Sequence, residues 1–267
     1  MGILTLLLKI VLGLVVVLVL LVVGVVLTAL AKAPRTVFDL AAPAAATPPA
    51  GRDARPVLVF GASGDTGSEV TRLLRLRGLP VTAAVRATSD RSRLTELGAQ
   101  FVVADVLDAG AVQAAVGSAD YQAVISIVGC LRCDPHPDFT GNRNIIDSVK
   151  AAGIRRMILV TTIGAGDSLE ATNLLTRVVL RPVLPLKTMA EDHLKASGLD
   201  YTIIRPGGLR PAGRPPTGHG QLTEDRQAFG YIARTDLAEL IVGALEDDRT
   251  VGHTFAAVDP GVRLPWR

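Results

Sequence analysis

The chain has 267 residues, a length that suits one large domain with an appendage. Apolar residues make up 49% of the chain and aromatic residues only 4%, so we expect a core of Val, Leu, Ile and Ala, as in a buried parallel sheet. The formal net charge is only +3 and the arginines are scattered, so we expect no nucleic acid among the partners.

The N-terminal segment is dominated by one apolar run. Ile10–Leu30 has 21 residues without a charge, enough for a helix to cross a hydrocarbon core of roughly 30 Å. We therefore predict a transmembrane helix that anchors the chain, within residues 1–32. A cleaved signal peptide is the alternative, since Ala29-Leu30-Ala31 resembles a cleavage site, but a signal peptide usually has an apolar region of about 7–15 residues.

More basic residues follow the apolar run than precede it, which favours a single-pass membrane protein whose folded part lies in the cytoplasm. Residues 33–55 are rich in Ala and Pro and are predicted to be a linker. Residues 56–267 are predicted to form the folded domain.

From Pro56 onward, strand and helix patterns alternate. Strands are predicted over Val57–Phe60, Val81–Val85, Phe101–Ala104, Ala123–Ile127, Met157–Thr161, Tyr201–Ile204 and Thr254–Val258. Helices are predicted over Thr66–Arg77, Arg91–Leu97, Ala109–Val116, Asn142–Ala152, Leu186–Ala196 and Thr235–Leu245. This alternation predicts an α/β fold, a Rossmann-type doubly wound parallel sheet. Pro206–Pro216 is predicted to be an irregular loop over the carboxyl ends of the strands, where such sheets bind ligands.

A glycine-rich turn joins the first predicted strand to the first helix of the domain. Glycine permits a tight turn at Gly61, a close approach to a pyrophosphate at Gly64 and close helix–strand packing at Gly67. The helix N-terminus then offers amide groups to phosphates. The strand–turn–helix context favours nucleotide binding over a turn that binds nothing. The predicted cofactor-binding residues here are Gly61, Ala62, Ser63, Gly64, Asp65, Thr66 and Gly67.

The residue that follows the second strand bears on the choice of cofactor. An acidic residue there would accept hydrogen bonds from a ribose 2′-hydroxyl, whereas this sequence has Arg86, which can bind a 2′-phosphate. We therefore expect NADP(H) as the preferred cofactor. Asp90 keeps NAD(H) possible, and a solvated surface arginine is the alternative role for Arg86.

Five further motifs extend this pattern: Asp105-Val106, Val128-Gly129, Thr161-Thr162-Ile163-Gly164-Ala165, Lys187-Thr188-Met189-Ala190-Glu191 and Tyr201-Thr202-Ile203-Ile204-Arg205-Pro206-Gly207-Gly208. With the glycine turn, they resemble the atypical branch of the short-chain dehydrogenase/reductase family, which includes NmrA-like and biliverdin reductase B-like (flavin reductase) proteins. The resemblance covers about residues 56–258.

The resemblance implies roles for individual residues. It implies an adenine contact for Asp105 and Val106, and a cofactor-ribose contact for Val128 and Gly129. It also adds two cofactor-binding residues from the last motif, Arg205 and Pro206. Its catalytic or substrate-polarising position falls on Thr161 and Thr162, with Lys187 holding the nicotinamide ribose.

The chain departs from the family at one catalytic position. Conventional members carry a Tyr four residues before the Lys, where it donates a proton, but this chain has Val183 four residues before Lys187. A substrate that takes its proton from water, such as a flavin, a quinone or a linear tetrapyrrole, would not need the tyrosine. We therefore expect a membrane-anchored oxidoreductase with a small conjugated or lipophilic substrate. The alternative is a non-catalytic NADP(H)-binding regulator or assembly factor, with a protein partner in a membrane complex.

Cys130 and Cys133 are the only cysteines, and they form a C-x-x-C pattern after the fourth strand. A redox pair is one interpretation and a metal site with His136 another, but one such pair supplies too few ligands for zinc. We expect a reducing compartment, a coincidental spacing and no metal. Asp138, which follows, is expected to cap or brace the next helix together with Asn142 and Asn144.

Overall fold

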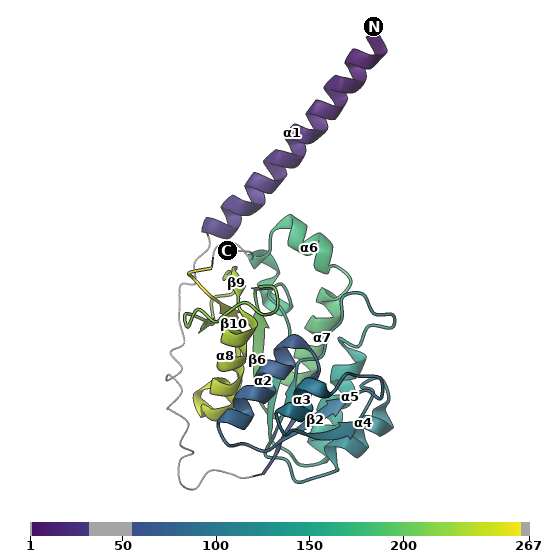
Figure 1. Cartoon of the computed structure of the whole chain (residues 1–267), viewed down its shortest axis with the longest axis vertical. Coiled ribbons are helices and arrows are strands. Elements are labelled where there is room, and N and C mark those ends of the chain that lie inside the picture. Colours follow the sequence, from purple (N-terminus) through teal and green to yellow (C-terminus); the bar gives the residue numbers. More distant parts are fainter. Residues whose placement is uncertain (1, 32–54, 263–267) are drawn as a thin grey trace.

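The computed structural model describes residues 2–31 and 55–262, so the predicted linker lies outside the described residues except for Arg55. The folded domain is a sheet between two layers of helices (Figure 1). Its main-sheet strands are β1 (Val57–Phe60), β2 (Val81–Val85), β3 (Gln100–Val103), β4 (Ala123–Ser126), β5 (Arg156–Val160), β6 (Asp200–Pro206), β8 (Gln221–Thr223) and β10 (His253–Val258). The helices of the domain are α2 (Asp65–Leu76), α3 (Ser92–Glu96), α4 (Ala109–Val116), α5 (Thr140–Ala151), α6 (Leu174–Leu180), α7 (Leu184–Lys195) and α8 (Arg234–Glu246), with 3₁₀ turns η1 (Gly166–Ala171) and η2 (Asp248–Thr250).

The strands of the main sheet run in the order β3-β2-β1-β4-β5-β6-β10-β8. All neighbouring strands pair in parallel except β8, which is antiparallel to β10. The chain order reverses between β1 and β4, and ligands bind at such switch points in doubly wound sheets. The predicted Rossmann-type fold is therefore confirmed. The prediction of a purely parallel sheet is wrong at one edge, where β8 is antiparallel.

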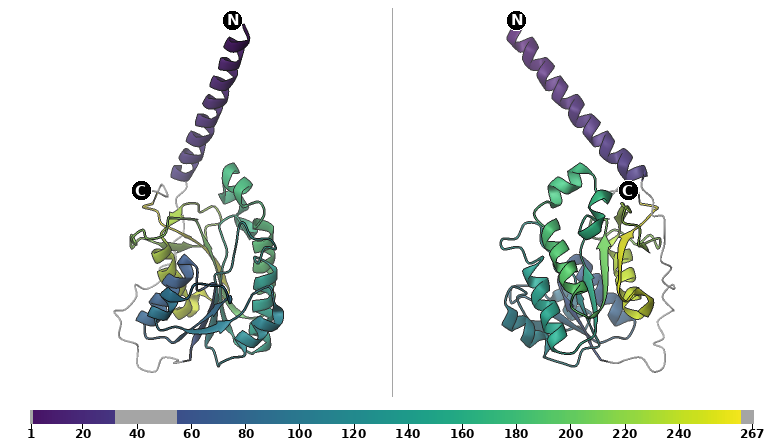
Figure 2. Two further views of the ribbon diagram at one scale, coloured as in Figure 1. Left: turned by 45° about the vertical axis from the view of Figure 1, so that its right-hand side comes forward. Right: turned by 180° about the vertical axis from the view of Figure 1, so that it is seen from behind.

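The two faces of the sheet have separate apolar cores, each beneath its own layer of helices (Figure 2). On one face α2 and α8 pack together over the sheet, and Val70, Leu74 and Ile241 are fully buried in that core. On the other face α4, α5 and α7 form a continuous layer, with Ile145 and Leu194 fully buried. Coverage on both sides explains why β1, β2 and β4 are runs of buried residues without alternation.

The apolar N-terminal run forms one continuous helix, α1 (Gly2–Ala31), drawn in purple in Figure 1. The side chains of α1 are described from residue 8 to residue 24, and all of these residues are exposed. Within the described part of the chain, no helix is long and apolar enough to cross a membrane. The helical conformation is thus as predicted, but this finding does not support the predicted membrane span.

Several short elements were not predicted from the sequence. They include η1, α6, the edge strand β8 and a small separate sheet of β7 (Gly208–Leu209) and β9 (Tyr231–Ile232). The segment predicted as an irregular loop, Pro206–Pro216, therefore contains a two-residue strand, and Gly208 pairs with Tyr231 beside the carboxyl end of β6. These elements surround the edge of the sheet at which the site lies.

Candidate functional site: a nucleotide cleft at the carboxyl ends of the strands

The glycine turn between β1 and α2 tolerates no side chain at two of its positions. Gly61 has a φ of +80°, and a Cβ there would lie 2.8 Å from the carbonyl oxygen of Ile127. A Cβ at Gly67 would lie 2.1 Å from the carbonyl oxygen of Gly61, because α2 packs directly on the end of β1. The roles predicted for these two glycines, a tight turn and close helix–strand packing, are therefore confirmed.

Gly64 plays a different part in the turn. It is the N-cap residue of α2 in extended conformation, and no side chain caps the helix. A Cβ at Gly64 would lie 3.4 Å from the carbonyl oxygen of Gly61, an ordinary van der Waals contact, so packing alone does not require glycine here. Ser63 and Gly64 are exposed while Ala62 is buried, so the exposed backbone of the turn and the first amides of α2 are available to an anion.

A cleft of about 330 Å³ lies at the switch point between β1 and β4. The residues that line it come from the glycine turn and the start of α2, from the ends of β4, β5 and β6, and from α6, β7, α7 and α8. They include the predicted residues Gly61, Gly64, Asp65, Thr66, Gly67, Val128, Gly129, Thr161, Thr162, Lys187 and Pro206. Segments that lie far apart in the sequence thus meet at one hollow of a size that suits a ligand.

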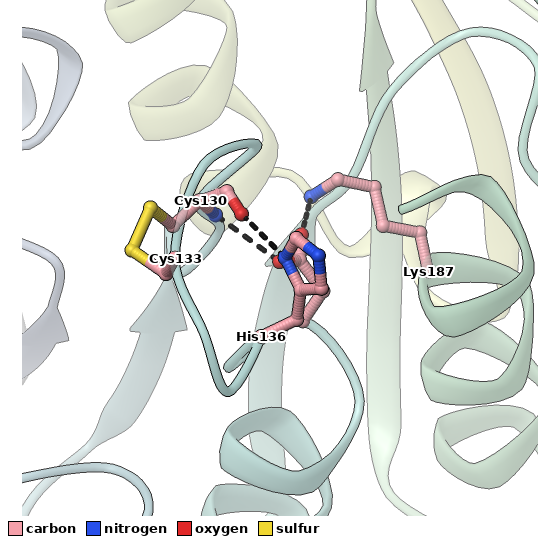
Figure 3. Close-up of a disulfide and its surroundings, with 5 residues drawn as sticks. Cys130, Cys133, His136 and Lys187 are labelled. Carbon is pink, nitrogen blue, oxygen red and sulfur yellow. Dashed lines mark hydrogen bonds and ion pairs between the residues drawn. A yellow bond between two sulfur atoms is a disulfide. The ribbon is translucent and has the colours of Figure 1, made fainter. Parts of the chain in front are cut away.

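Lys187 extends from α7 (Figure 3) and lines this cleft, where Asp138 holds it. Its Nζ lies 2.8 Å from Asp138 Oδ1, and the Asp138 carboxylate is fully buried. A Cβ at Gly129 would lie 2.7 Å from the same ammonium group, so glycine is needed for the lysine to reach this position. The second carboxylate oxygen of Asp138 accepts a hydrogen bond of 3.1 Å from the amide of Cys130.

Val183 stands where conventional members of the family carry tyrosine. It is the N-cap residue of α7, is buried and lines the cleft. A phenol at this position would therefore face the site, and this chain places an isopropyl group there instead.

The two threonines after β5 are not equivalent. Thr161 is buried, and its hydroxyl donates a 2.7 Å hydrogen bond to Glu191 Oε1. Thr162 is partly exposed and lines the cleft, and no partner for its hydroxyl occurs in the described part of the chain. Thr162 is thus the better placed of the two to donate a hydrogen bond to a substrate.

Arg205, which was predicted to bind the cofactor, is not among the residues that line the cleft. Its guanidinium donates to both carboxylate oxygens of buried Glu191, at 3.0 and 2.6 Å, and to Asp167 Oδ1 at 2.6 Å. Burial alone would lower the pKa of Arg205, but the hydrogen bonds and charges of Glu191 and Asp167 outweigh it and raise the pKa. This ion pair joins the Lys187–Glu191 motif on α7 to strand β6, so Arg205 supports the site by positioning β6.

The residues predicted to contact the adenosine half of the cofactor lie beyond this cleft. Arg86 follows β2 and Asp105 follows β3; both are exposed, and Val106 is half-buried. Arg93 of α3 adds a second cation beside α2, since its Nη1 donates a hydrogen bond to Ser68 Oγ at 2.9 Å. Their assigned contacts remain predictions.

The cysteine pair departs from the expectation of a coincidental spacing. Cys130 and Cys133 are joined by a disulfide, and Cys130 lines the cleft (Figure 3). The two cysteines can form this bond because the chain after β4 turns back on itself and places their Cα atoms 5.5 Å apart. A disulfide does not match the reducing compartment expected from the low cysteine count. No cluster of metal-binding side chains occurs among the described residues.

Other cleft residues were missed by sequence reasoning. Arg234, at the start of α8, lines the cleft, and its Nε lies 3.7 Å from Asp65 of the glycine turn. Asp138 was expected only to cap or brace a helix, and it instead holds Lys187; Asn142 does brace the helix start, donating to the Asp138 carbonyl at 2.7 Å. The place of Asp138 after the fourth strand could have indicated a site residue, whereas no local pattern marks Arg234.

Comparisons with known proteins agree with this geometry. A family model described as NAD(P)H-binding matches residues 61–248. The structure of ChuY, an anaerobilin reductase from Escherichia coli O157:H7, superposes with a TM-score of 0.69 at 32% identity, covering 78% of this chain and 98% of that one.

Two further proteins are similar to this chain in sequence. An uncharacterized chloroplastic protein of Arabidopsis thaliana is 35% identical over 202 residues, 71% of each chain. The NAD(P)H azoreductase of Xenophilus azovorans is 29% identical over 220 residues, 76% of this chain and 68% of that protein. On the family match and these identities, the chain belongs to the NAD(P)H-binding family of atypical short-chain dehydrogenases/reductases.

Proposed function

We propose that this protein is an NADP(H)-dependent reductase of a small conjugated or lipophilic acceptor, such as a flavin, a quinone or a linear tetrapyrrole. The observation that carries the proposal is the composition of the cleft. It joins the glycine turn to the Lys187–Asp138 pair, while apolar Val183 stands where a proton-donating tyrosine would be. The chain thus keeps groups suited to binding the cofactor and lacks the usual proton donor.

The described residues fit a dinucleotide. Gly61 and Gly67 let the turn pack closely on the backbone around it, and Gly129 leaves room for the ammonium group of Lys187. The backbone of the turn and the N-terminus of α2 would hold the pyrophosphate, and Lys187 the nicotinamide ribose. Arg86 would bind the 2′-phosphate of NADP(H), with Asp105 and Val106 at the adenine. When bound, the nicotinamide supplies or accepts the hydride.

Polar side chains of the cleft would orient the substrate, and Val183 leaves no phenol there to transfer a proton. Asp138 fixes the ammonium of Lys187 and balances its charge at the cleft wall. Thr162 can donate a hydrogen bond to a carbonyl or ring nitrogen of the acceptor, whereas Thr161 is committed to Glu191. An acceptor that takes its proton from water suits this arrangement.

The apolar part of the cleft favours a lipophilic acceptor. Leu131, Leu180, Val183 and Leu209 line it. The adjoining helix α6 buries none of its residues, and Leu174 and Val178 are 71% and 62% exposed. Apolar surface that continues from a cleft onto an exposed helix is typical of a binding site for an apolar ligand.

We further propose that α1 attaches the domain to a membrane, with the domain on the cytoplasmic side. The support is in the sequence: 21 residues without charge, Ile10–Leu30, and more basic residues after the run than before it. Fractionation of cells that express the full chain tests this. The protein should stay with membranes after an alkaline carbonate wash, and release by the wash would refute the attachment.

A non-catalytic NADP(H)-dependent regulator is the second candidate. Val183 favours it, because the position of the missing phenol is filled by a side chain that can neither donate nor accept a proton. In this case cofactor binding would occur without turnover.

The experiment that separates the two candidates uses the full chain in detergent. NADPH binding is measured by its fluorescence, and NADPH oxidation is then followed with flavins, quinones and azo dyes as acceptors. Saturable binding with turnover of at least one acceptor is expected, and Thr162→Val should lower kcat in that reaction while leaving NADPH binding unchanged. Binding without turnover on any acceptor would refute the reductase and favour the regulator.

A further inference from the structure

The Cys130–Cys133 disulfide lies at the wall of the proposed nucleotide cleft. Cys130 lines the cleft, and both cysteines are partly exposed, in a loop whose other residues, Leu131, Arg132 and Asp134, are exposed. The bond spans only three positions of the sequence. So small a ring restrains few residues of the unfolded chain, so we expect it to contribute little to global stability and to act mainly on the local loop.

This loop is connected to Lys187 by two direct contacts. The amide of Cys130 donates to Asp138 Oδ2 at 3.1 Å, and Asp138 Oδ1 pairs with Lys187 Nζ at 2.8 Å. A third contact closes the loop on itself, since His136 Nδ1 lies 2.9 Å from the carbonyl oxygen of Cys130 (Figure 3). The backbone of one half of the disulfide therefore orients the carboxylate that holds the lysine.

We propose that Cys130–Cys133 is a reversible thiol–disulfide exchange site that tunes cofactor binding in the cleft. The reductant is a dithiol, either a small molecule or a dithiol protein. With the disulfide closed, the Cys130 amide is held against Asp138; with it open, the loop gains freedom and the contact is weakened. The effect on the cofactor rests on the proposed function, in which Lys187 contacts NADP(H).

The dithiol supplies both electrons that reduce the Cys130–Cys133 bond. A thiolate of the dithiol attacks one sulfur of the Cys130–Cys133 bond and forms a mixed disulfide, while the other cysteine leaves as a thiolate and takes a proton from solvent. The second thiol of the reductant then displaces the remaining cysteine. The protein gains two electrons and two protons, and the dithiol loses them as it closes into its own disulfide.

The test compares oxidised and dithiothreitol-reduced full-length protein in detergent. Alkylation and mass spectrometry count the thiols, amide hydrogen exchange reports the loop over residues 127–140, and NADPH fluorescence gives Kd. We expect two new thiols per chain, faster exchange in the loop, and a Kd for NADPH raised about 3- to 10-fold, the effect of losing one hydrogen bond. Reoxidation should restore both values.

Cys133→Ser is the matched variant, because it opens the ring and leaves Cys130 in place. It should show the exchange and the Kd of the reduced protein and should not respond to dithiothreitol. If it fails to fold, the two redox forms of the unmodified protein still give the comparison.

Two outcomes would overturn the proposal: absence of the disulfide in protein kept under air, or loop exchange that is the same in both redox forms. An unchanged Kd with altered exchange would overturn the link to the cofactor. Absence of NADPH binding in both forms would instead refute the proposed function, and the thiol count and exchange rates would still decide whether the disulfide controls the loop.

Discussion

The buried ion pair between Glu191 and Arg205 offers the sharpest test of how the site is supported. Glu191 is fully buried, accepts hydrogen bonds from Thr161 and from two nitrogens of Arg205, and carries the charge that balances the guanidinium. Glu191→Gln keeps the shape but removes the charge, and the new amide N–H groups face donors instead of acceptors. We therefore expect a substantial loss of stability.

The magnitude follows from the partners that remain. Removing one member of a buried pair typically costs about 3–5 kcal/mol, because it leaves a charge uncompensated. Asp167 still accepts from Arg205 at 2.6 Å, but its side chain is 49% exposed and balances the charge less well. We expect a loss near the lower limit, about 3 kcal/mol, which corresponds to a fall in Tm of about 6–12 °C for a domain of this size.

The assay is denaturant unfolding of the full chain, with thermal unfolding as a second probe. Asp167→Asn is the matched control, since it removes the exposed partner and should cost at most about 1 kcal/mol. The double variant Glu191→Met/Arg205→Met should be less destabilised than Glu191→Gln, because no uncompensated charge remains. A Glu191→Gln variant within 1 kcal/mol of the unmodified protein would refute the reasoning.

Four further outcomes are expected. Gly67→Ala would place a Cβ 2.1 Å from a backbone oxygen, so it should lower the free energy of unfolding by about 1–3 kcal/mol and weaken NADPH binding. Gly64→Ala should change the free energy of unfolding by less than about 1 kcal/mol, and equal effects of the two variants on stability would contradict the packing argument. Lys187→Met should raise the Kd for NADPH about tenfold by removing a charge-assisted hydrogen bond, and an unchanged Kd would remove Lys187 from the site. Arg86→Asp should shift the preference from NADPH towards NADH in competition binding, and an unchanged preference would refute its role. Burial alone would raise the pKa of Asp167, but Arg205 and neighbouring cations lower this pKa below 3.8. The Asp167 carboxylate therefore stabilises the fold above pH 3.8, and this stabilisation is lost as the pH falls through the lowered pKa. Asp167→Asn should make the free energy of unfolding less dependent on pH in this acid range.

The elements of the domain that repeat a local pattern were predictable from the sequence. The bounds of β1, β2 and α4 agree with the prediction, because buried β-branched runs and a closing glycine mark them. The short edge strand β8 has only three residues and takes its conformation from pairing with β10, so no local periodicity reveals it. The same holds for β7 and β9.

Site residues were predictable from the sequence where their role depends on the local backbone. They were less predictable where the role depends on contacts with residues far away in the sequence. Gly61 and Gly67 carry their signal in their spacing, and the structure gives both the predicted role. Arg205 carries a motif signal, but its guanidinium turns to Glu191, a contact that only the packing of α7 on β6 decides. The disulfide was not expected, because proximity of Cys130 and Cys133 depends on the turn after β4 rather than on their count.

Titration of the full-length protein with NADPH tests the central claim most directly. The geometry of the glycine turn, the Lys187–Asp138 pair and Arg86 predicts saturable binding with a Kd below about 1 mM, tighter for NADPH than for NADH. Gly67→Ala should weaken that binding in the same titration. Absence of saturable NADPH binding by the folded, unmodified chain would contradict the account.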